Sequence, residues 1–309
     1  MSGLRVDVIV CTYNRERWLR RCLDSLLSHE PRPARVIVVD GPSTDGTRDL
    51  LTKLEAEGKI VLVRQEALEG ISAARNLGLS ASDADIVCFL DDDAVPLNGW
   101  LSAIISGYRD EGVGGVGGPV YDLDGRISLG ANMMTVYGDW VEGPDARARG
   151  GLFPMMVGCN MSFRRRVLES VGGFDVYYRF HNDETDTCLR VLRSGFRIIH
   201  HEGAGVLHEA CEGSYRRDTL KWYLKLRYLW GRNSAYLISK NLRDSVTFRR
   251  YAGSRLSRSV TRRLSPARGG VEADRKIPFP LPAVGIVVEI VGMLEGWSDG
   301  KRVTLSSRQ

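Results

Sequence analysis

Short runs of hydrophobic residues alternate with amphipathic stretches over the first hundred or so residues of the chain. A run without polar alternation is typical of a strand that is buried on both faces. Four such runs predict strands at residues 6–10, 36–39, 60–63 and 86–90. Between them, apolar residues recur every three or four positions, as in a helix with one buried face. Helices are expected after Asn14, which can cap the first one, after Gly46, at 71–79 and after Asn98.

Strands that alternate with helices indicate βαβ units, and therefore an α/β protein with a Rossmann-like, mostly parallel sheet flanked by helices. In such sheets, ligands bind beyond the carboxyl ends of the strands. Three polar segments occupy that place here: residues 11–14, Asp40 and residues 91–93. We expect them to lie at one edge of the sheet.

The pattern changes in the second half of the chain. Residues 113–214 are rich in glycine and less regular, with a strand expected within 156–163 and a helix at about 184–193. Beyond them, helices are expected at 221–242, 245–264 and 283–297, with a proline-rich linker at 265–282. We therefore predict an α/β domain of residues 1–214 followed by a helical C-terminal extension of residues 215–309.

Charge follows the same division. The 309 residues carry a formal net charge of +5, but residues 1–214 hold a net charge of −8 and residues 215–309 a net charge of +13. The hydrophobic share of 43% is ordinary for a globular protein and excludes a disordered or collagen-like chain. An acidic body suits cation-assisted chemistry, and a basic tail suits an anionic partner.

The six cysteines are scattered without a C-x-x-C pair, which indicates a reducing compartment. The N-terminal apolar run is too short for a signal peptide, and no run of about 20 apolar residues predicts a spanning helix. These features favour a cytoplasmic protein. His208 and Cys211 have a spacing that zinc ligands use, but no second ligand pair lies nearby in the sequence.

Asp91, Asp92 and Asp93 directly follow the fourth predicted strand. Adjacent carboxylates repel one another, so their joint ionisation favours a bound cation. Hard oxygen ligands suit Mg²⁺ or Mn²⁺, which complete their shell with water and substrate phosphates. The alternative is a solvated acidic loop that caps the next helix, but the position at the end of a parallel strand favours the metal.

The other strand ends carry groups that suit a nucleotide. Thr12, Tyr13 and Asn14 offer a hydroxyl, a ring and an amide after the first strand, and Asp40 can accept a hydrogen bond from a base N–H. Arg75 can reach a phosphate. Each also has an ordinary explanation, as a helix cap, a turn acid or a surface charge. The chain contains neither G-x-G-x-x-G nor G-x-x-x-x-G-K-[ST], so dinucleotide-binding and P-loop chemistry lose support.

Seven segments together resemble glycosyltransferase family 2, whose catalytic domain has the GT-A fold. They are VIVCTYNR (8–15), VVDGPSTDGT (38–47), ISAARNLGL (71–79), FLDDDAVP (89–96), VGCNMSFRRRVLESVGGFD (157–175), DETDTCLRVLRSGFRI (183–198) and VLHE (206–209). Their order and spacing also match the family, over about the first 215 residues. The resemblance implies an inverting transferase that uses a nucleotide-diphosphate sugar and a divalent metal.

The resemblance also implies roles for individual residues. Those expected to bind the nucleotide sugar are Thr12, Tyr13, Asn14, Asp40, Arg75, Asp91 and Asp92. Asp93 and His208 would hold Mn²⁺ or Mg²⁺ on the diphosphate. Gly158 and Asn160 would lie near the donor sugar or the acceptor.

The general base comes from an acidic pair. The family pattern resembles Glu-Asp-x-Asp-x-x-x-Arg, whereas this chain has Asp183-Glu184-Thr185-Asp186, with the pair reversed. Alignment on Asp186 and Arg190 places the base at Glu184, with Asp183 beside it. A glutamate can do this work because both acids have ordinary pKa values near 4. The alternative is that these acids stabilise the positive N-terminal end of the following helix.

The basic region 215–309 lies outside the seven segments. Arginines recur among apolar residues over 248–263, as in a helix at a membrane surface that carries anionic lipid. Such a surface suits a lipid-linked acceptor and a peripheral location on the inner face of the membrane. A homodimer interface and an ordinary solvated helix are the alternatives. Nucleic-acid binding is not expected, because no recognised motif accompanies the charge.

These observations predict a transferase that adds a single sugar to a saccharide or lipid-linked acceptor. The family's processive polysaccharide synthases carry a Q-x-x-R-W motif and several spanning helices, neither of which occurs in this sequence. A sugar nucleotidyltransferase is one alternative, but it needs a Gly-rich loop that residues 8–20 lack. A non-catalytic sugar-binding protein is another, and the intact acidic clusters argue against it.

Overall fold

The computed structural model describes residues 3–129, 132–135, 140–141, 152–209, 220–242, 246–254 and 281–306. The chain divides into two compact units, Met1–Met133 with Val141–Glu212 and Met134–Trp140 with Gly213–Gln309. Every residue predicted above to bind donor, acceptor or metal belongs to the first unit. Three parts of the sequence prediction lie outside the described residues: the basic stretch 255–264, linker residues 265–280 and Cys211.

The first unit alternates strands and helices in the predicted order. Its first half contains β1 (Val6–Thr12), α1 (Glu16–Leu27), β2 (Arg35–Asp40), α2 (Thr47–Ala56), β3 (Val61–Arg64), α3 (Ile71–Ser80), β4 (Ile86–Asp91), β5 (Ala94–Pro96) and α4 (Trp100–Gly107). Its second half contains β6 (Val113–Gly117), β7 (Val120–Tyr121), β8 (Ile127–Leu129), β11 (Leu152–Met155), β12 (Asn160–Arg164), α5 (Arg165–Ser170), α6 (Asp183–Arg193), β13 (Arg197–His200) and β14 (Val206–His208). Strands β9 (Asn132–Thr135) and β10 (Trp140–Val141) stand where the chain leaves and re-enters this unit.

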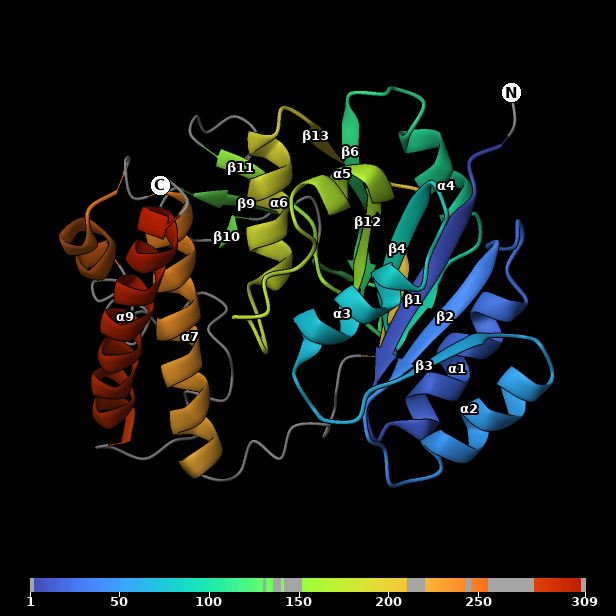
Figure 1. The fold of residues 1–309 in the computed structure, drawn as a ribbon, viewed down its shortest axis with the longest axis horizontal. Coiled ribbons are helices and arrows are strands. Elements are labelled where there is room, and N and C mark those ends of the chain that lie inside the picture. Colours follow the sequence, from blue (N-terminus) through green and yellow to red (C-terminus); the bar gives the residue numbers. More distant parts are fainter. Residues whose placement is uncertain are drawn as a thin grey trace. The chain divides into compact units, whose positions relative to one another are not determined.

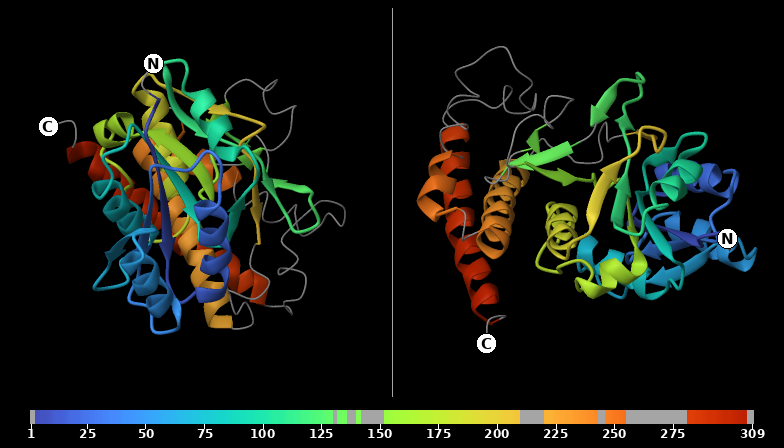
Figure 2. Two further views of the ribbon diagram at one scale, coloured as in Figure 1. Left: turned by 90° about the vertical axis from the view of Figure 1, so that its right-hand side faces the viewer. Right: turned by 90° about the horizontal axis from the view of Figure 1, so that it is seen from above.

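Seven strands form the central sheet, in the order β13-β6-β12-β4-β1-β2-β3 (Figure 1). β1 pairs in parallel with β2 and β4, whereas β12 runs antiparallel between β4 and β6. The sheet is therefore mostly parallel, as predicted. Its helices lie on both faces, which Figure 2 shows from two further sides.

Neighbouring residues of β1 explain this two-sided cover, because successive side chains of a strand point to opposite faces. Val8 and Val10 belong to the buried cluster that contains Leu19 and Leu23 of α1. Ile9 instead faces α3, where a Cβ atom on Gly78 would lie only 2.4 Å from its Cγ2. The absence of a side chain at Gly78 thus allows α3 to pack closely on the sheet.

Two predicted helix caps are wrong. Arg15, not Asn14, is the N-cap of α1, and Asn14 has a left-handed backbone with φ of 54°. The Asn14 side chain instead accepts a hydrogen bond from the Thr44 backbone N–H, at 2.7 Å. Gly99, not Asn98, is the N-cap of α4. Asn14 therefore ties the end of β1 to the loop after β2.

The strand order marks the end of this sheet at which a ligand is expected. β2 and β3 follow β1 on one side, while β4 lies on the other, so the order of connection reverses between β1 and β4. Such a reversal opens a crevice at the carboxyl ends of the strands. Cys11 of β1 is in register with Asp91 of β4, which brings the polar segments after both strands side by side.

A second sheet, in the order β5-β14-β7-β8, brings His208 to the carboxyl end of β4. β14 runs antiparallel to β5 and pairs His208 with Ala94. His208 is therefore held next to Asp93, although 115 positions separate the two residues in the sequence.

The second unit is built around α7 (Leu220–Asn241) and α9 (Leu281–Ser306). The two helices pack with their backbones close together, since a Cβ atom on Gly296 would lie 1.9 Å from the Arg232 carbonyl oxygen. Arg227 and Glu289 form a buried ion pair between them, at 2.5 Å. Within the described ranges, no helix has the length and apolar character needed to cross a membrane.

Candidate active site

The turn between β4 and β5 carries the three predicted aspartates. Thr12 donates a hydrogen bond from its hydroxyl to Asp92 Oδ2, at 2.7 Å. The Arg15 Nε atom lies 3.0 Å from Asp92 Oδ1, and the same guanidinium forms an ion pair with Asp93. Asp92 and Asp93 are buried, while the side chain of Asp91 is 38% exposed. The end of β1 thus fixes two of the carboxylates and leaves Asp91 open to a ligand.

His208 contacts the acidic turn directly. Its Nε2 atom lies 3.0 Å from Asp93 Oδ1, so the two residues expected to hold a metal are in contact. Burial by itself lowers the pKa of His208, but the hydrogen bond and charge of Asp93 outweigh it and raise the pKa above the ordinary value. The imidazole and the carboxylate therefore stabilise one another.

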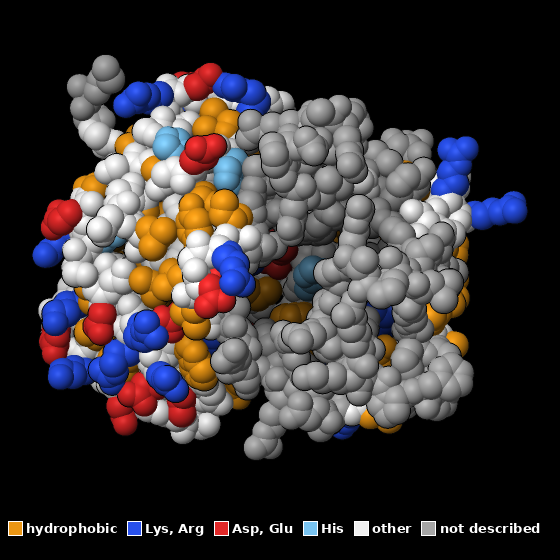
Figure 3. All heavy atoms as spheres, turned by 180° about the vertical axis from the view of Figure 1, so that it is seen from behind, with side chains coloured by type: hydrophobic (Ala, Val, Ile, Leu, Met, Phe, Trp, Pro, Cys, Tyr) orange, Lys and Arg blue, Asp and Glu red, His pale blue; other side chains and the backbone are white. Residues whose placement is uncertain are grey.

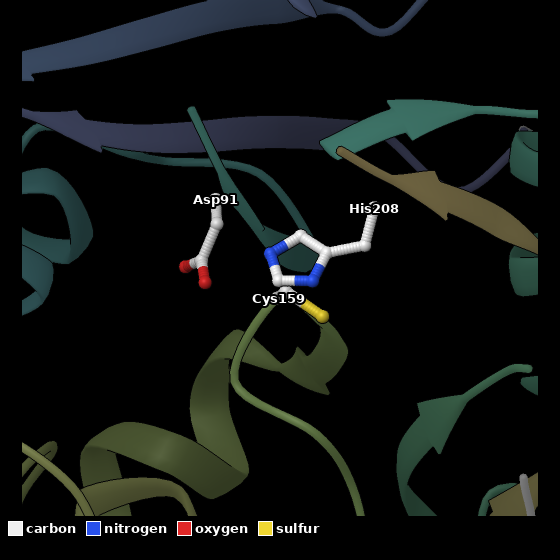
Figure 4. Close-up of side chains that lie close together, drawn as sticks. All are labelled: Asp91, Cys159 and His208. Carbon is white, nitrogen blue, oxygen red and sulfur yellow. The ribbon is translucent and has the colours of Figure 1, made fainter. Parts of the chain in front are cut away.

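Cys159 joins this group from the turn before β12. One ligand atom each of Asp91, Cys159 and His208 lies within 4.8 Å of the other two (Figure 4). The three side chains come from three separate strand ends and converge on one point. Sequence reasoning missed Cys159, although it stands between the two residues of this turn that were singled out, Gly158 and Asn160.

A second polar group lies at the end of β2. Asp40 is fully buried, and its Oδ1 atom accepts a hydrogen bond from the Ser43 hydroxyl, at 2.6 Å. Among the described residues, its Oδ2 atom has no hydrogen-bond partner. Burial raises the pKa of Asp40 above its ordinary value, and the bond from Ser43 opposes that shift only in part.

Tyr13 lies beside this carboxylate. A Cβ atom on Gly41 would lie 3.1 Å from the Tyr13 ring, so the ring rests on the residue that follows Asp40. The side chain is 39% exposed, which is unusual for a ring so near the core. A buried acceptor beside an exposed ring is an arrangement that can bind a nucleobase through an N–H group and through stacking.

Arg75 joins three parts of the site. Its guanidinium forms an ion pair with Asp183, lies 3.3 Å from Asp91 Oδ1 and donates a hydrogen bond to the Gly158 carbonyl oxygen, at 3.0 Å. A Cβ atom on Gly158 would lie 3.0 Å from the same nitrogen. Arg75 is buried, so its ordinary explanation as a surface charge is wrong. It holds the acidic turn and the start of α6 together.

The acidic pair opens α6, where both side chains are buried. Asp183 forms an ion pair with Arg75. The pKa of Glu184 is raised, first by burial and then by the negative charge of the neighbouring Asp183. A raised pKa makes a carboxylate a stronger base. Asp186 forms an ion pair with Arg190, at 2.7 Å, so it belongs to the helix itself. The two members of the pair therefore have different environments.

The segment that leads into α6 is fastened to α3. Asn76 makes two hydrogen bonds with the backbone of Phe174, both at 2.8 Å. The Ser72 hydroxyl donates to the Tyr178 carbonyl oxygen, at 2.6 Å. His181 and Asn182, the last residues before the helix, both have left-handed backbones. These bonds hold a strained segment in place, and with it the direction in which the acidic pair enters the site.

Asn160 is fully buried, and its side chain is hydrogen-bonded within the protein. Its buried amide accepts a hydrogen bond from Trp100 Nε1, at 3.0 Å, and donates one to the Ala204 carbonyl oxygen, at 2.8 Å. These bonds fix β12 against α4 and the segment before β14. Its predicted place near the sugar or acceptor stays a prediction.

The charges around the site are local. Figure 3 shows acidic and basic side chains interspersed over the described part of one face. The cation that lies nearest to the acidic turn is Arg15, which sequence reasoning gave no role. The sequence did contain an indication of this role, because Arg15 directly follows residues 12–14, which were predicted to bind the nucleotide. A diphosphate at this edge would therefore be attracted by a few placed cations rather than by a broad basic surface.

Comparison with known proteins agrees with this geometry. The chain is 27% identical over 244 residues to the glucosyl-dolichyl phosphate glucuronosyltransferase of Haloferax volcanii, which covers 74% of this chain and 75% of that protein. It is 28% identical over 243 residues to the pre-mycofactocin glycosyltransferase of Mycobacterium tuberculosis, covering 75% of this chain and 47% of that protein.

Two solved structures share the fold. A mannosyltransferase from Pyrobaculum calidifontis, in complex with GDP-Man and Mn²⁺, superposes with a TM-score of 0.60 at 20% identity, over 100% of this chain and 89% of that one. GalNAc-T7, solved with UDP, GalNAc and Mn²⁺, gives a TM-score of 0.59 at 15% identity, over 77% of this chain and 50% of that one. The predicted GT-A fold is confirmed.

The family assignment rests on the sequence itself. A family model described as glycosyl transferase family 2 matches residues 7–172, which is more than half of the chain. That range contains Tyr13 with Asp40, the acidic turn, Arg75 and the turn with Cys159. The strand order and the acidic residues at the carboxyl ends of the strands agree with this match. The chain belongs to glycosyl transferase family 2.

Proposed function

We propose that the protein is a metal-dependent, inverting glycosyltransferase that moves one sugar from a nucleotide-diphosphate donor to an acceptor hydroxyl. One observation carries the proposal: Arg75 joins the acidic turn after β4 to the acidic pair of α6. The proposed metal site and the proposed base would then lie on either side of one guanidinium. The two solved structures named above hold a nucleotide and Mn²⁺, which supports this choice of donor and metal.

The nucleobase would bind at Asp40 and Tyr13. The Asp40 Oδ2 atom is buried and, within the described residues, lacks a partner. A buried acceptor without a hydrogen bond costs about 1–3 kcal/mol, and a base N–H removes that cost. Both uracil and guanine offer such a group. A thermal-shift panel of nucleoside diphosphates with Mn²⁺ would identify the base, since the bound ligand stabilises the folded state.

Asp93 and His208 fit a divalent metal. Their ligand atoms are in contact, and a carboxylate with an imidazole is a donor set that Mn²⁺ accepts. Asp91, which is partly exposed, is placed to reach the ribose or a metal-bound water. When bound, the metal supplies positive charge beside the departing diphosphate. Arg15 adds a second positive charge at the same turn.

Glu184 would act as the general base. It accepts the proton of the acceptor hydroxyl while that oxygen attacks the anomeric carbon from the face opposite the diphosphate. The new carbon–oxygen bond forms as the bond to the diphosphate oxygen breaks, its electron pair leaves with the diphosphate, and the configuration inverts. Asp183 is paired with Arg75 and would position the helix rather than take the proton.

Turnover with and without metal tests this function. We expect release of nucleoside diphosphate from the donor with Mn²⁺ and none after EDTA treatment. Turnover by the D93N variant should fall at least about 100-fold. Losses of this size are typical when an enzyme loses one group that stabilises the charge of the transition state. D49N, which changes an exposed aspartate of α2, is the matched control. Full activity in a metal-free preparation would overturn the proposal, and pyrophosphate as the product would point to a nucleotidyltransferase.

We also propose that the second unit meets an anionic membrane surface that carries a lipid-linked acceptor. Val284, Val287, Val291 and Leu294 of α9 are 42% to 60% exposed. Their spacing of three and four residues places them on one face of the helix. Region 215–309 carries a net charge of +13, which attracts anionic lipid. The Haloferax volcanii relative is named for a dolichyl phosphate substrate, which supports a lipid-linked acceptor.

Vesicle co-sedimentation tests the membrane contact. The V287D/V291D double variant should lose binding to vesicles that contain anionic phosphatidylserine. V303D, which changes an exposed valine on another side of α9, should keep it. Equal sedimentation of wild type and double variant would reject the contact. A dimer in light scattering that the double variant abolishes would show a homodimer interface in its place.

A further inference from the structure

We propose that Asp91, Cys159 and His208 form a binding site for a soft divalent cation such as Zn²⁺, and that occupation of this site blocks the donor metal. The site brings together an oxygen, a sulfur and a nitrogen ligand from the ends of three strands (Figure 4). It shares His208 with the proposed donor-metal pair and differs from it by the thiol.

The geometry suits a small cation with tetrahedral coordination. Zn–S and Zn–N distances of about 2.3 and 2.0 Å place tetrahedral ligands roughly 3.3–3.8 Å apart. The three ligand atoms already lie within 4.8 Å of one another, so side-chain movements of about 1 Å complete the site. Asp91 is partly exposed, which leaves a route for the cation and a fourth position for water.

The ligand types decide which metal is held. Mg²⁺ and Mn²⁺ prefer oxygen and gain little from sulfur, whereas Zn²⁺ and Cd²⁺ gain most from a thiolate. Cys159 is buried beside the acidic turn and is free of any disulfide. On binding, the thiol loses its proton to the solvent and the sulfur forms a bond to the cation, without any redox change.

Binding of Zn²⁺ has a predictable consequence for transfer, which rests on the function proposed above. His208 Nε2 contacts Asp93, and a soft cation that pulls the imidazole toward Cys159 weakens that contact. Asp91 is taken at the same time. Zn²⁺ is therefore expected to inhibit transfer at concentrations far below those of the Mn²⁺ that supports it.

Titration of the metal-free, full-length protein with Co²⁺ tests the site without any donor. Co²⁺ bound to a thiolate absorbs in the near ultraviolet, and we expect this band in the wild type and its loss on addition of Zn²⁺. C159A should lack the band. C88A, which removes a thiol that is equally buried in the core of β4, should keep it. No band in the wild type, or the same band in C159A, would overturn the proposal.

A second variant covers a folding failure of C159A. H208Q keeps the thiol but removes the nitrogen ligand, and it should weaken Co²⁺ binding at least tenfold while circular dichroism stays unchanged. Unaltered Co²⁺ affinity in H208Q would equally overturn the ligand set.

Inhibition is measured separately. With each variant compared to its own rate without zinc, C159A should need at least tenfold more Zn²⁺ than C88A for half inhibition. Equal sensitivity of the two variants would overturn the inhibitory role. If no nucleotide sugar is turned over at all, the proposed function fails, while the Co²⁺ spectrum still decides whether the site exists.

Discussion

At the scale of single residues, the site depends on how each carboxylate is paired. Asp183 is neutralised by Arg75, Asp93 is in contact with Arg15 and His208, and one oxygen of Asp40 is satisfied by Ser43. Six acidic residues of the site were predicted from sequence, because their positions after strands or before a helix follow from the local pattern. Apart from Ser43, which is three residues from Asp40, these partners are distant in sequence. No local pattern therefore indicates which of the other carboxylates is paired and which is open.

The pH dependence of nucleotide binding follows from Asp40. Burial raises its pKa, and the ionised form is the stronger acceptor for a base N–H at the unpaired Oδ2 atom. Affinity for the nucleoside diphosphate should therefore fall as the pH is lowered through this raised pKa, at a higher pH than for an ordinary aspartate. Calorimetric titration at several pH values measures it.

The D40N variant provides the comparison for this pH profile. It keeps an acceptor oxygen but has no proton to gain, so the part of the profile that is due to Asp40 should disappear. Parallel profiles for wild type and D40N would assign the pH dependence to the metal site instead.

At the scale of elements, α3 determines where the acidic pair lies. Gly70, the N-cap of α3, has φ of 102° and ψ of 171°, a conformation that is essentially confined to glycine. A Cβ atom there would lie 2.6 Å from the Arg179 Cα atom. The Ile71 backbone N–H donates to the Arg179 carbonyl oxygen, at 3.1 Å. Close contact of these two backbones thus sets the approach to α6.

Alanine at position 70 should be costly for two separate reasons. G70A adds backbone strain of about 1–3 kcal/mol and a clash that costs a further ~1–3 kcal/mol. G58A has a positive φ of 66° but meets nothing within 4 Å, so it measures the strain alone. Urea unfolding should show a clearly larger loss for G70A. Equal losses would mean that the contact with Arg179 does not constrain the loop.

The elements themselves were largely predictable from the hydrophobic pattern. Strands β1, β2, β3 and β4 each start within one residue of their predicted positions, because buried parallel strands read as uninterrupted apolar runs. The hydrophobic pattern did not predict that β12 inserts antiparallel between β4 and β6, or that the short strands β5 and β14 pair with each other. These strands bring Cys159 and His208 to the acidic turn. The convergence of Asp91, Cys159 and His208 could therefore not be predicted from the sequence.

At the scale of the whole molecule, the chain divides into two compact units, for which we propose separate tasks. The residues of the proposed donor and metal sites belong to the first unit, and the close helix pair α7 and α9 belongs to the second. Glycines of α9 permit this close pairing, so a single added side chain there would disturb it.

A glycine substitution separates the two units experimentally. G296A should destabilise the second unit because the new methyl group would lie 1.9 Å from the Arg232 carbonyl oxygen. G253A, with open space around it, should be neutral or slightly stabilising. Nucleoside diphosphate binding by the first unit should be the same in both variants. Loss of that binding in G296A would show that the donor site depends on the second unit.

We propose that a metal-assisted donor site and a separate base share the carboxyl end of the central sheet, and the E184Q variant separates the two. Calorimetry with Mn²⁺ and the nucleoside diphosphate should give wild-type affinity, because the proposed base acts on the acceptor hydroxyl and not on the nucleotide. Single-turnover transfer should fall by about 10²–10⁴-fold, as expected for loss of a general base. E55Q, at an exposed position on α2, serves as the control. Near-normal turnover by E184Q with the donor bound would contradict the account.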